Sequence, residues 1–307
     1  MKEKGYTSND VVAKLRGILR MKKIGHTGTL DPQAEGVLPI CLGKATKIAG
    51  YLTDTDKTYR CVMRLGLRSD TEDMTGKVTA VSDCRGISFE EITDAILSFK
   101  GEYDQIPPMY SAKKINGRKL YELAREGIEI ERRPSRVNIK DIYDIASLKS
   151  ETYDDTAVAD VDGKADGDGY PGVQFTVECS KGTYIRSLCR DIGEKLGCGA
   201  VMESLIRIRA CGIDIGDCLT LSEIERIVRE GNDTDGIENR IFPIDRFYED
   251  CSRIQVSGRT EIMVRNGNKF KAGTTLSGRY RVYFEDGTFA AIYDIEKGEA
   301  RLCRLFL

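Results

Sequence analysis

Apolar positions recur at helical spacing in several segments that begin with polar residues. After Ser8-Asn9-Asp10, the apolar residues Val11, Val12, Leu15, Ile18 and Leu19 recur at this spacing and predict a capped amphipathic helix. Ser88 and Glu91 stand at capping-box spacing, so a second capped helix is predicted over residues 88–99. Further helices are predicted over residues 45–52, 120–126 and 185–196, and Gly127 is expected to end the second of these.

Alternating or short continuous apolar runs predict strands. They cover residues 36–43, 58–65 and 173–179, and near the end of the chain 280–284, 289–293 and 300–305. Residues 105–110 contain Pro107-Pro108 and are expected to form an extended loop. Residues 150–172 are rich in Asp, Gly and Ala and poor in core residues, which predicts a flexible acidic surface insertion.

The order of these elements indicates the fold class. Helices and strands interleave irregularly, so an α+β fold with a mixed sheet flanked by helices and loops is favoured over a doubly wound parallel sheet. The glycine-separated strands after about residue 250 predict a small C-terminal β-rich domain. A chain of 307 residues suits about two domains, and we place them at residues 1–245 and 246–307.

Composition excludes several classes of protein. No apolar run approaches the roughly 20 residues of a membrane span, and the first residues have no apolar signal-peptide core. The ten cysteines include no Cys-x-x-Cys pair, and reduced thiols in the cytoplasm are expected. With one histidine and no paired cysteines, the chain offers little material for a transition-metal site, so no metal is expected.

Charge is distributed unevenly along the chain, although the net charge is only −2. Residues 1–60 hold eleven Lys and Arg against six Asp and Glu, a net of +5, whereas residues 141–170 hold two against nine, a net of −7. A basic N-terminal part suits a polyanionic partner, although a solvated charged face would look the same in sequence.

One polar loop carries the first candidate for chemistry. Residues 25–32 read Gly25-His26-Thr27-Gly28-Thr29-Leu30-Asp31-Pro32. The glycines permit a close approach of the backbone, and Pro32 keeps Asp31 out of a helix, so the carboxylate is presented from a loop. An ordinary turn in which Asp31 caps the backbone would have the same sequence.

Three later segments carry similar polar groups. Lys57-Thr58-Tyr59-Arg60 places an aromatic residue among cations on a predicted strand, and residues 68–76 form a polar loop that contains Asp73. In Ser180-Lys181-Gly182-Thr183-Tyr184-Ile185-Arg186 a tyrosine and an arginine stand two residues apart. On a strand, this spacing would put both side chains on one face.

Four of these segments together resemble a known family. The loop at residues 25–32, Lys57-Thr58-Tyr59-Arg60, Pro107-Pro108-Met109-Tyr110-Ser111-Ala112-Lys113 and residues 179–186 resemble, in this order, the bacterial tRNA pseudouridine-55 synthases of the TruB family. The resemblance covers roughly residues 4–212. It implies a pseudouridine-synthase fold and a cofactor-free enzyme that isomerises the T-loop uridine of tRNA after flipping the base out of the stack.

The resemblance also implies roles for individual residues. Asp31 matches the catalytic aspartate, which acts either as a nucleophile or as a base, and Arg186 matches the arginine that orients it. Tyr59 matches the tyrosine that stacks on the flipped base, and His26 matches the histidine that fills or braces the vacated stack. As alternatives from the residues alone, Tyr59 could be a core aromatic and His26 a structural histidine.

Two further matches are contacts to the substrate nucleotide. Tyr184 and Leu205 occupy the corresponding positions, although Leu205 could equally be part of a helix core. Asp73 matches a family aspartate to which we assign no role.

The predicted partner is the T-arm of tRNA. Residues 111–135 form a basic insertion that corresponds to the family's RNA-gripping segment, and its contacts should weaken with salt. The cations expected to contact the RNA backbone are Lys57, Lys113, Lys114, Arg118 and Lys119. The C-terminal segment takes the place of a PUA-like or TruB-type β domain. A monomer without an obligate protein partner is expected.

Three other classes of protein are alternatives, and the N-terminus departs from the usual pattern of the family. A non-catalytic tRNA-binding or tRNA-folding protein could use the same surface, but it would not need Asp31, Tyr59 and Arg186 together. A tRNA transglycosylase would need a zinc-type cluster, and a guide-RNA-dependent synthase would be expected to carry a long basic extension. The family usually opens with an apolar strand before the element at Lys2–Ser8, so we expect a start site placed too late or a shortened chain.

Overall fold

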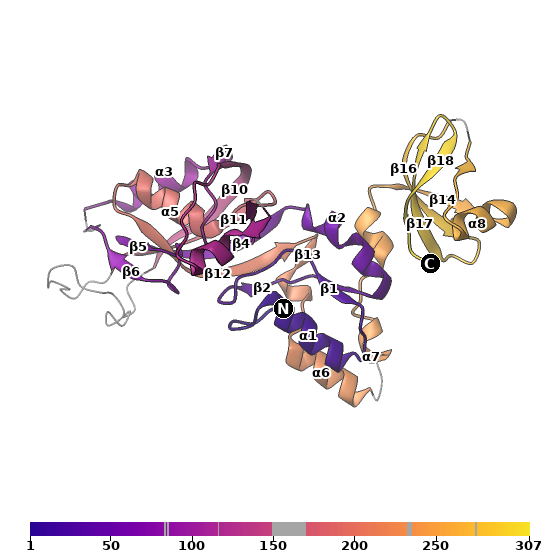
Figure 1. Ribbon diagram of the computed structural model, residues 1–307, viewed down its shortest axis with the longest axis horizontal. Helices are drawn as coiled ribbons and strands as arrows, with labels where there is room; N and C mark the ends of the chain where they lie inside the picture. Colours follow the sequence, from indigo (N-terminus) through magenta and orange to yellow (C-terminus); the bar gives the residue numbers. More distant parts are fainter. Residues whose placement is uncertain (83, 85, 116, 149–169, 232–234, 274) are drawn as a thin grey trace. The chain divides into compact units, whose positions relative to one another are not determined.

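The computed structural model describes residues 1–82, 84, 86–115, 117–148, 170–231, 235–273 and 275–307 (Figure 1). It divides into two compact units, and the chain passes between them several times. The first unit comprises Met1–Gly5, Leu30–Val37 and Thr55–Cys218, and the second comprises Tyr6–Thr29, Leu38–Asp54 and Leu219–Leu307. Of the acidic insertion predicted at 150–172, residues 150–169 lie outside the described residues.

A seven-stranded sheet forms the centre of the first unit. The strand order is β13-β12-β4-β11-β10-β7, and β2 also pairs with β12. The strands are β2 (Glu35–Gly36), β4 (Lys57–Leu65), β7 (Gly101–Gln105), β10 (Ser135–Leu148), β11 (Gly172–Cys179), β12 (Ala200–Ala210) and β13 (Ile213–Asp214). All neighbours are antiparallel except β2 and β12, so the predicted mixed, mainly antiparallel sheet is confirmed.

The core of this unit lies on one face of the sheet. Along β4 the side chains of Tyr59, Cys61, Met63 and Leu65 alternate onto this face and are buried, as the period of a strand requires. Helices α3 (Phe89–Leu97) and α5 (Ile185–Lys195) complete the same hydrophobic cluster and touch each other (Figure 1). Burial of this apolar surface is the main force that holds the unit together.

Smaller elements surround this sheet. They are the hairpin of β5 (Leu67–Ser69) and β6 (Val78–Ala80), the hairpin of β8 (Lys114–Ile115) and β9 (Arg118–Lys119), and helix α4 (Leu120–Arg125). Ser88 caps α3 through the predicted capping box with Glu91. Gly127 follows α4 with a φ of +71°, as predicted for the end of this helix.

Among the described residues of the second unit, hydrophobic side chains gather in two clusters. The first joins α1 (Ser8–Ile18) to α6 (Leu221–Glu230), and the two helices contact each other (Figure 1). Other elements of this part are β1 (Ile24–His26), β3 (Ile40–Leu42), the 3-10 helix η1 (Gly43–Ile48), α2 (Ala49–Thr53) and α7 (Asp235–Glu238). The N-cap of α1 is Thr7, which forms a capping box with Asp10, so the helix begins at Ser8, one residue earlier than a cap at Ser8 would imply.

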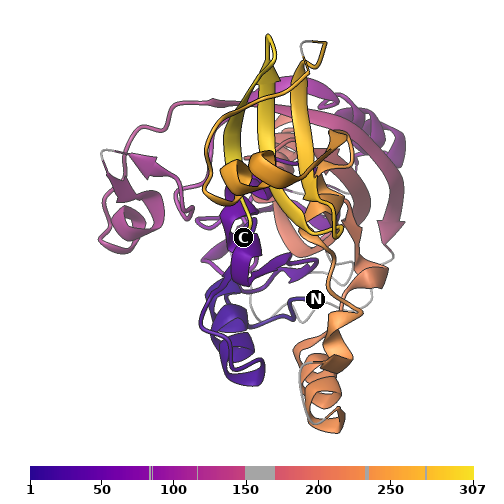
Figure 2. The ribbon, with the colours of Figure 1, turned by 90° about the vertical axis from the view of Figure 1, so that its right-hand side faces the viewer.

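The second cluster lies in the predicted C-terminal β-rich part. Its five strands follow the order β14-β16-β17-β18-β15, and β16 to β18 are the yellow strands of Figure 2. The elements are β14 (Ser252–Val256), α8 (Gly258–Arg265), β15 (Phe270–Lys271), β16 (Gly278–Phe284), β17 (Phe289–Glu296) and β18 (Glu299–Leu305). Short 3-10 helices, η3 (Ile215–Asp217) in the first unit and η4 (Ile244–Tyr248) in the second, lie in the connections.

Several sequence predictions differ from the structure. The strand predicted at 36–43 is two strands, because Gly36 pairs with β12 whereas Ile40 pairs with β1. Gly25 and His26 lie on β1 rather than in a loop. The pattern analysis did not predict β10, β12 or α6, and Leu205, considered as possible helix core, lies on strand β12.

The segment that contains Tyr184 and Arg186 also differs from its prediction. Tyr184 is the N-cap of α5 and Arg186 lies in the first turn of that helix, so they are not strand neighbours on one face. The first turn of a helix therefore sets the direction of the Arg186 side chain.

Candidate active site

Asp31 lies in a turn that is fixed to the core on both sides. Leu30 and Ala34 are 4% and 1% exposed and belong to the main hydrophobic cluster, and the Ala34 N–H donates to the Asp31 carbonyl over 3.1 Å. The Asp31 side chain itself is 43% exposed. The turn therefore holds a carboxylate that is both anchored through its backbone and accessible.

The buried side chain of Lys2 holds the backbone of this turn. This side chain is fully buried, and its Nζ donates to the carbonyl oxygens of Pro32 over 3.0 Å and Ala34 over 2.6 Å. The Gly5 N–H also donates to the Pro32 carbonyl over 2.9 Å. The backbone on the C-terminal side of Asp31 is thus held by a buried cation.

Arg186 forms an ion pair with Asp31. Its Nη2 lies 3.0 Å from Asp31 Oδ2, and the arginine side chain is only 6% exposed. The same Nη2 donates to the Tyr110 carbonyl over 2.9 Å, and Nη1 donates to the Thr71 carbonyl over 2.9 Å. A planar guanidinium held at two carbonyls has a fixed direction, so it fixes the position of the carboxylate that it pairs with.

Asp73 organises the loop that contributes Thr71. Its Oδ1 accepts the Thr71 hydroxyl over 2.7 Å and the Thr75 N–H over 2.9 Å, while Oδ2 lies 3.7 Å from Arg186 Nη1. This carboxylate therefore links the folding of the polar loop to the position of Arg186. The role that the resemblance left unassigned for Asp73 is a structural contact to the arginine.

Two tyrosines and a leucine lie in the same unit around this ion pair. Tyr59 is 7% exposed and shares the core cluster with Leu30 and Leu205, which is 8% exposed. Burial raises the pKa of Tyr59, with a smaller contribution from Asp31, whereas Arg207 acts in the opposite direction. Tyr59 is therefore a core aromatic whose phenol also responds to the charge of Asp31.

Tyr184 is only partly buried. Burial raises the pKa of its phenol, Ser111 and Arg186 oppose this rise, and Asp31 adds to it. Burial is the main cause of the raised pKa of both tyrosines, and the Asp31 charge adds to it in each case.

His26 is the one predicted substrate contact that lies in the second unit. It is on β1, where its backbone pairs with Ile40 of β3. Its contact with the substrate stays a prediction.

The predicted RNA-backbone cations differ in their exposure. Arg118 is exposed and paired with Glu126, and Lys119 lies 5.3 Å from the ring centre of Tyr121. Lys113 donates to the Ser135 hydroxyl, and Lys114 lies on β8. Lys57 is only 8% exposed, its ammonium donates to the Thr55 carbonyl, and burial lowers its pKa, so it is the least suited of the five to contact RNA.

The sequence did not reveal the polar residues that hold the loop and the helix of this site in place. Glu72 pairs with Arg190 of α5 and accepts the Ser187 hydroxyl over 2.6 Å, which ties the polar loop to the helix that carries Arg186. Gln105 contacts the main chain of Tyr184. The signal that could have found Gln105 is an amide side chain at the end of a strand, directly before the extended Pro107-Pro108 segment.

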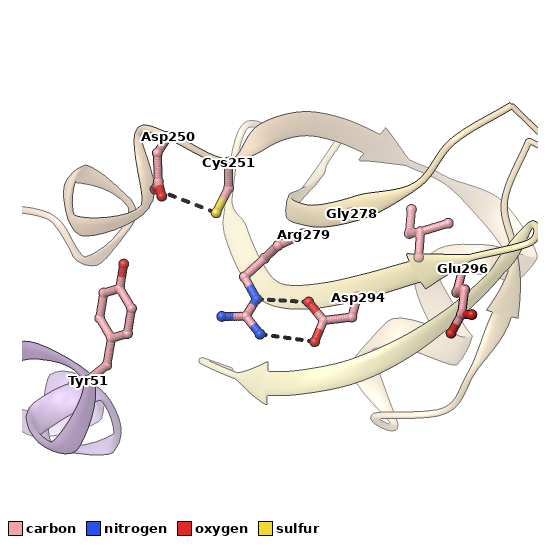
Figure 3. Close-up of a pocket in the computed structure, with 8 residues that line it drawn as sticks. Tyr51, Asp250, Cys251, Gly278, Arg279, Asp294 and Glu296 are labelled. Atoms are coloured by element: carbon pink, nitrogen blue, oxygen red, sulfur yellow. Dashed lines mark hydrogen bonds and ion pairs between the residues drawn. The ribbon is translucent and has the colours of Figure 1, made fainter. Parts of the chain in front are cut away.

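A separate hollow of about 490 Å³ lies in the second unit (Figure 3). It is lined by Tyr51, Asp250, Cys251, Gly278, Arg279, Asp294, Ile295 and Glu296. The Arg279 guanidinium is paired through two contacts, of 2.8 and 3.0 Å, with the Asp294 carboxylate. Its strongest donor is therefore already used within the protein, and the ion pair of the first unit remains the better candidate site.

No group of three or more His, Cys, Asp or Glu side chains in the described ranges is placed to hold a metal ion. No helix in the described part of the chain is long and apolar enough to cross a membrane.

Comparison with solved structures supports the fold. The protein of a solved H/ACA ribonucleoprotein bound to a substrate RNA containing 2′-deoxyuridine matches with a TM-score of 0.66 at 23% identity, over 100% of this chain and 83% of that one. A chain of a Cbf5–Nop10–Gar1 complex matches with a TM-score of 0.67 at 24% identity, again over 100% and 83%. At these identities the likeness concerns the fold.

Comparison with family models and curated proteins supports the activity. Residues 16–185 match the N-terminal domain of the TruB family pseudouridylate synthases, and residues 186–248 match the C-terminal domain of tRNA pseudouridylate synthase B. The tRNA pseudouridine synthase B of Alkaliphilus oremlandii is 44% identical over 88% of this chain and 80% of its own length. The protein of the same name from Clostridium kluyveri is 40% identical over 100% of this chain and 97% of its own length.

The fold and these matches define an enzyme of the pseudouridine synthase class that acts on tRNA. Within that class, the chain belongs to the TruB family. The resemblance found in four sequence segments is thereby confirmed.

Proposed function

We propose that this enzyme converts the T-loop uridine at position 55 of tRNAs into pseudouridine, with Asp31 as the catalytic carboxylate. The observation that carries the proposal is the 3.0 Å ion pair between Asp31 and Arg186, in which the arginine is buried and the carboxylate is 43% exposed. Such a carboxylate is oriented by the protein and open to a nucleotide. The charge of this carboxylate contributes to the raised pKa of both Tyr59 and Tyr184.

The reaction is an isomerisation that needs no redox partner. The N1–C1′ bond of the uridine breaks, the base rotates, and a C5–C1′ bond forms; the C5 proton leaves and N1 gains a proton. An ionised carboxylate can serve this sequence by attacking the sugar or base, or by taking a sugar proton. Both roles require the oriented Asp31 that Arg186 provides, and the proposal does not choose between them.

The uridine must leave the stack of the T-arm before Asp31 can reach it. Tyr59 would stack on the flipped base, Tyr184 and Leu205 would contact the nucleotide, and His26 would brace the vacated stack. Stacking of a base on an aromatic side chain contributes about 1–3 kcal/mol. Tyr59 is 7% exposed and Tyr184 is partly buried, so the flipped base would have to reach the edge of the core to make these contacts.

The RNA backbone would be held by the basic insertion at residues 111–135. Its cations are Lys113, Lys114, Arg118 and Lys119, while Lys57 contributes less because it is buried. Residues 1–245 would act as the synthase domain and 246–307 as a PUA-like or TruB-type domain of a cytoplasmic monomer. No obligate protein partner and no cofactor enter this proposal.

The test is release of tritium from a tRNA transcript labelled at C5 of uridine, because formation of the C5–C1′ bond expels the C5 hydrogen. We expect the wild type to release one tritium per transcript with uridine at position 55 and none from that position when it is cytidine. Asp31→Asn should reduce the rate by about 10²–10⁴-fold or more. Asp94→Asn, which alters an exposed aspartate of α3, should leave it unchanged.

Each alternative has its own result. Equal release by wild type and Asp31→Asn would refute the assignment of Asp31. Release that does not depend on position 55 would refute the proposed target. Tight tRNA binding by a folded wild type without any release would favour the non-catalytic RNA-folding protein.

A further inference from the structure

We infer that Gln105 is a positioning residue for the Asp31–Arg186 pair, because its side-chain amide fixes the first turn of the helix from which Arg186 extends. This inference rests on the proposed function of Asp31. It concerns a residue that does not itself touch the ion pair.

The Gln105 side chain is bound to one residue through both of its polar atoms. Its Oε1 accepts the Tyr184 N–H over 2.8 Å, and its Nε2 donates to the Tyr184 carbonyl over 3.0 Å. Nε2 also contacts the Tyr103 hydroxyl, and Gln105 is only 1% exposed. Because an amide offers a donor and an acceptor at a fixed separation, it pairs with a main chain much as a neighbouring strand would.

Gln105 contacts α5 at its N-terminus, where the helix has no side-chain cap of its own. Tyr184 is the N-cap residue, in an extended conformation, and its side chain makes no capping hydrogen bond. Its carbonyl already accepts the Leu188 N–H over 3.0 Å, so the second lone pair of that oxygen is available to Gln105. The start of α5 is thus fixed from outside the helix, by the end of β7.

The position of Arg186 depends on the start of this helix. Arg186 stands two residues after Tyr184, and its guanidinium meets Asp31, Thr71 and Tyr110 at 2.9–3.0 Å. A rotation or shift of the first turn would move all of these contacts together. Displacements of about 1 Å in a catalytic group can cost about 100-fold in rate.

The segment after Gln105 supports the same helix. The Ile106 carbonyl accepts Arg190 Nη2 over 3.1 Å, and the Tyr110 carbonyl accepts Arg186 Nη2 over 2.9 Å. Residues 105–110 therefore hold the helix at its start, at its first turn and one turn later. Of these three contacts, the one from Gln105 is made to the main chain at the start of the helix.

The competing explanation is that Gln105 only satisfies buried polar groups and contributes to stability. The two explanations differ in kinetics. A positioning residue changes kcat while the KM for tRNA stays nearly constant, since the RNA-backbone cations lie elsewhere. It also loses its effect when Arg186 is already altered, whereas a purely structural residue affects both backgrounds equally.

The experiment measures single-turnover tritium release and tRNA affinity for Gln105→Glu and Gln105→Met. Gln105→Glu keeps the shape and the acceptor but loses the donor, and Gln105→Met keeps only the shape. The matched controls are Gln174→Glu and Gln174→Met on β11, a half-buried position of the same sheet. Thermal unfolding and circular dichroism of each variant establish that it is folded.

We expect Gln105→Glu to lower the rate by about 10–100-fold with less than about a threefold change in KM, in line with one or two lost hydrogen bonds at the site. Gln105→Met should be slower still, and the Gln174 variants should match the wild type. In the Arg186→Lys background, Gln105→Glu should lower the rate of tritium release by less than about threefold.

The inference is overturned if a folded Gln105→Glu variant is as fast as Gln174→Glu. It is also overturned if Gln105→Glu lowers the rate by the same factor in the wild type and in the Arg186→Lys background. If Gln105→Met does not fold, Gln105→Glu decides the question alone. An inactive wild type, in contrast, would contradict the proposed function itself. An active wild type, inactive Asp31→Asn and fully active Gln105 variants would refute this inference only.

Discussion

The buried Lys2 provides a sharp test of how the turn at Asp31 is held. Lys2→Met keeps most of the apolar stem of the side chain and removes the ammonium group that donates to the Pro32 and Ala34 carbonyls at 3.0 and 2.6 Å. We expect the variant to be less stable and less active than the wild type. The reason is that the backbone following Asp31 loses its buried donor.

The magnitude follows from the contacts. A hydrogen bond to a charged group contributes about 1.5–3 kcal/mol, so two of them give an upper figure of about 3–6 kcal/mol. Burial of an ammonium group costs several kcal/mol and offsets part of this gain. The Pro32 carbonyl keeps the Gly5 N–H as a donor in the variant, whereas the Ala34 carbonyl loses Lys2. We therefore expect a net loss of about 2–3 kcal/mol of unfolding free energy.

The assay is differential scanning calorimetry, because the chain has no tryptophan to report unfolding by fluorescence and calorimetry resolves more than one transition in a protein of two units. For a unit of this size, 2–3 kcal/mol corresponds to a decrease in Tm of about 4–12 °C. Tritium release should slow by about tenfold or more, since the Asp31 turn becomes less ordered. The matched control is Lys4→Met, which changes an exposed lysine two residues away and should alter neither value.

Equal Tm values for Lys2→Met and Lys4→Met would show that the buried ammonium does not stabilise the turn. A large loss of stability with an unchanged rate at low temperature would show that the turn keeps its geometry without Lys2. Either result would refute the argument from the carbonyl contacts.

Two further predictions concern the pH dependence and the packing of the first unit. Burial raises the pKa of Asp191 to about 6, so the folded state binds more protons than the unfolded state between about pH 4 and 6, and the wild type loses stability as the pH rises through this window. Asp191→Asn removes the titrating carboxyl group. In urea unfolding, the stability of this variant relative to the wild type should therefore rise by up to about 2 kcal/mol from pH 4 to 7. A difference in stability that stays constant with pH would contradict the raised pKa of Asp191. Gly36 has a φ of +110°, and a Cβ there would lie 2.2 Å from the Arg207 carbonyl oxygen, so Gly36→Ala should cost more than about 3 kcal/mol by the same measurement. Gly50→Ala, where nothing lies within 4 Å of the added carbon, is the control and should be neutral or slightly stabilising; similar losses in both variants would refute the close contact.

Local patterns predicted those elements whose regularity is unbroken. The capping box of α3, the alternating β4 and the strand β11 were found because each follows one period along its length. Strand β12 was missed because bulges interrupt its pairing with β4, between Met202 and Ser204 and between Arg207 and Arg209. A bulge shifts the alternation by one residue, so the period-2 signal disappears although the strand continues.

Long-range pairing limited the prediction at residues 36–43. The glycine-bounded apolar run suggested one strand, but its two halves pair with different sheets in different units. Nothing within the run indicates where the partners lie. The same limit applies to the site, since the Asp31–Arg186 pair came from the resemblance to a family and Gln105 was not found at all.

The contacts of Arg186 suggest why the fold needs so many separate segments at this point. The turn at Asp31 is anchored by Lys2, the loop at Thr71 is folded around Asp73, and the segment ending at Tyr110 begins with the contact of Gln105 to α5. All three meet at one guanidinium that is 6% exposed, yet the carboxylate beside it stays 43% exposed. A salt bridge that served stability alone would gain nothing from leaving one partner accessible. A buried, fixed cation beside an accessible, oriented carboxylate is what a nucleophile or a base requires, because the protein restricts its direction while the substrate can still reach it.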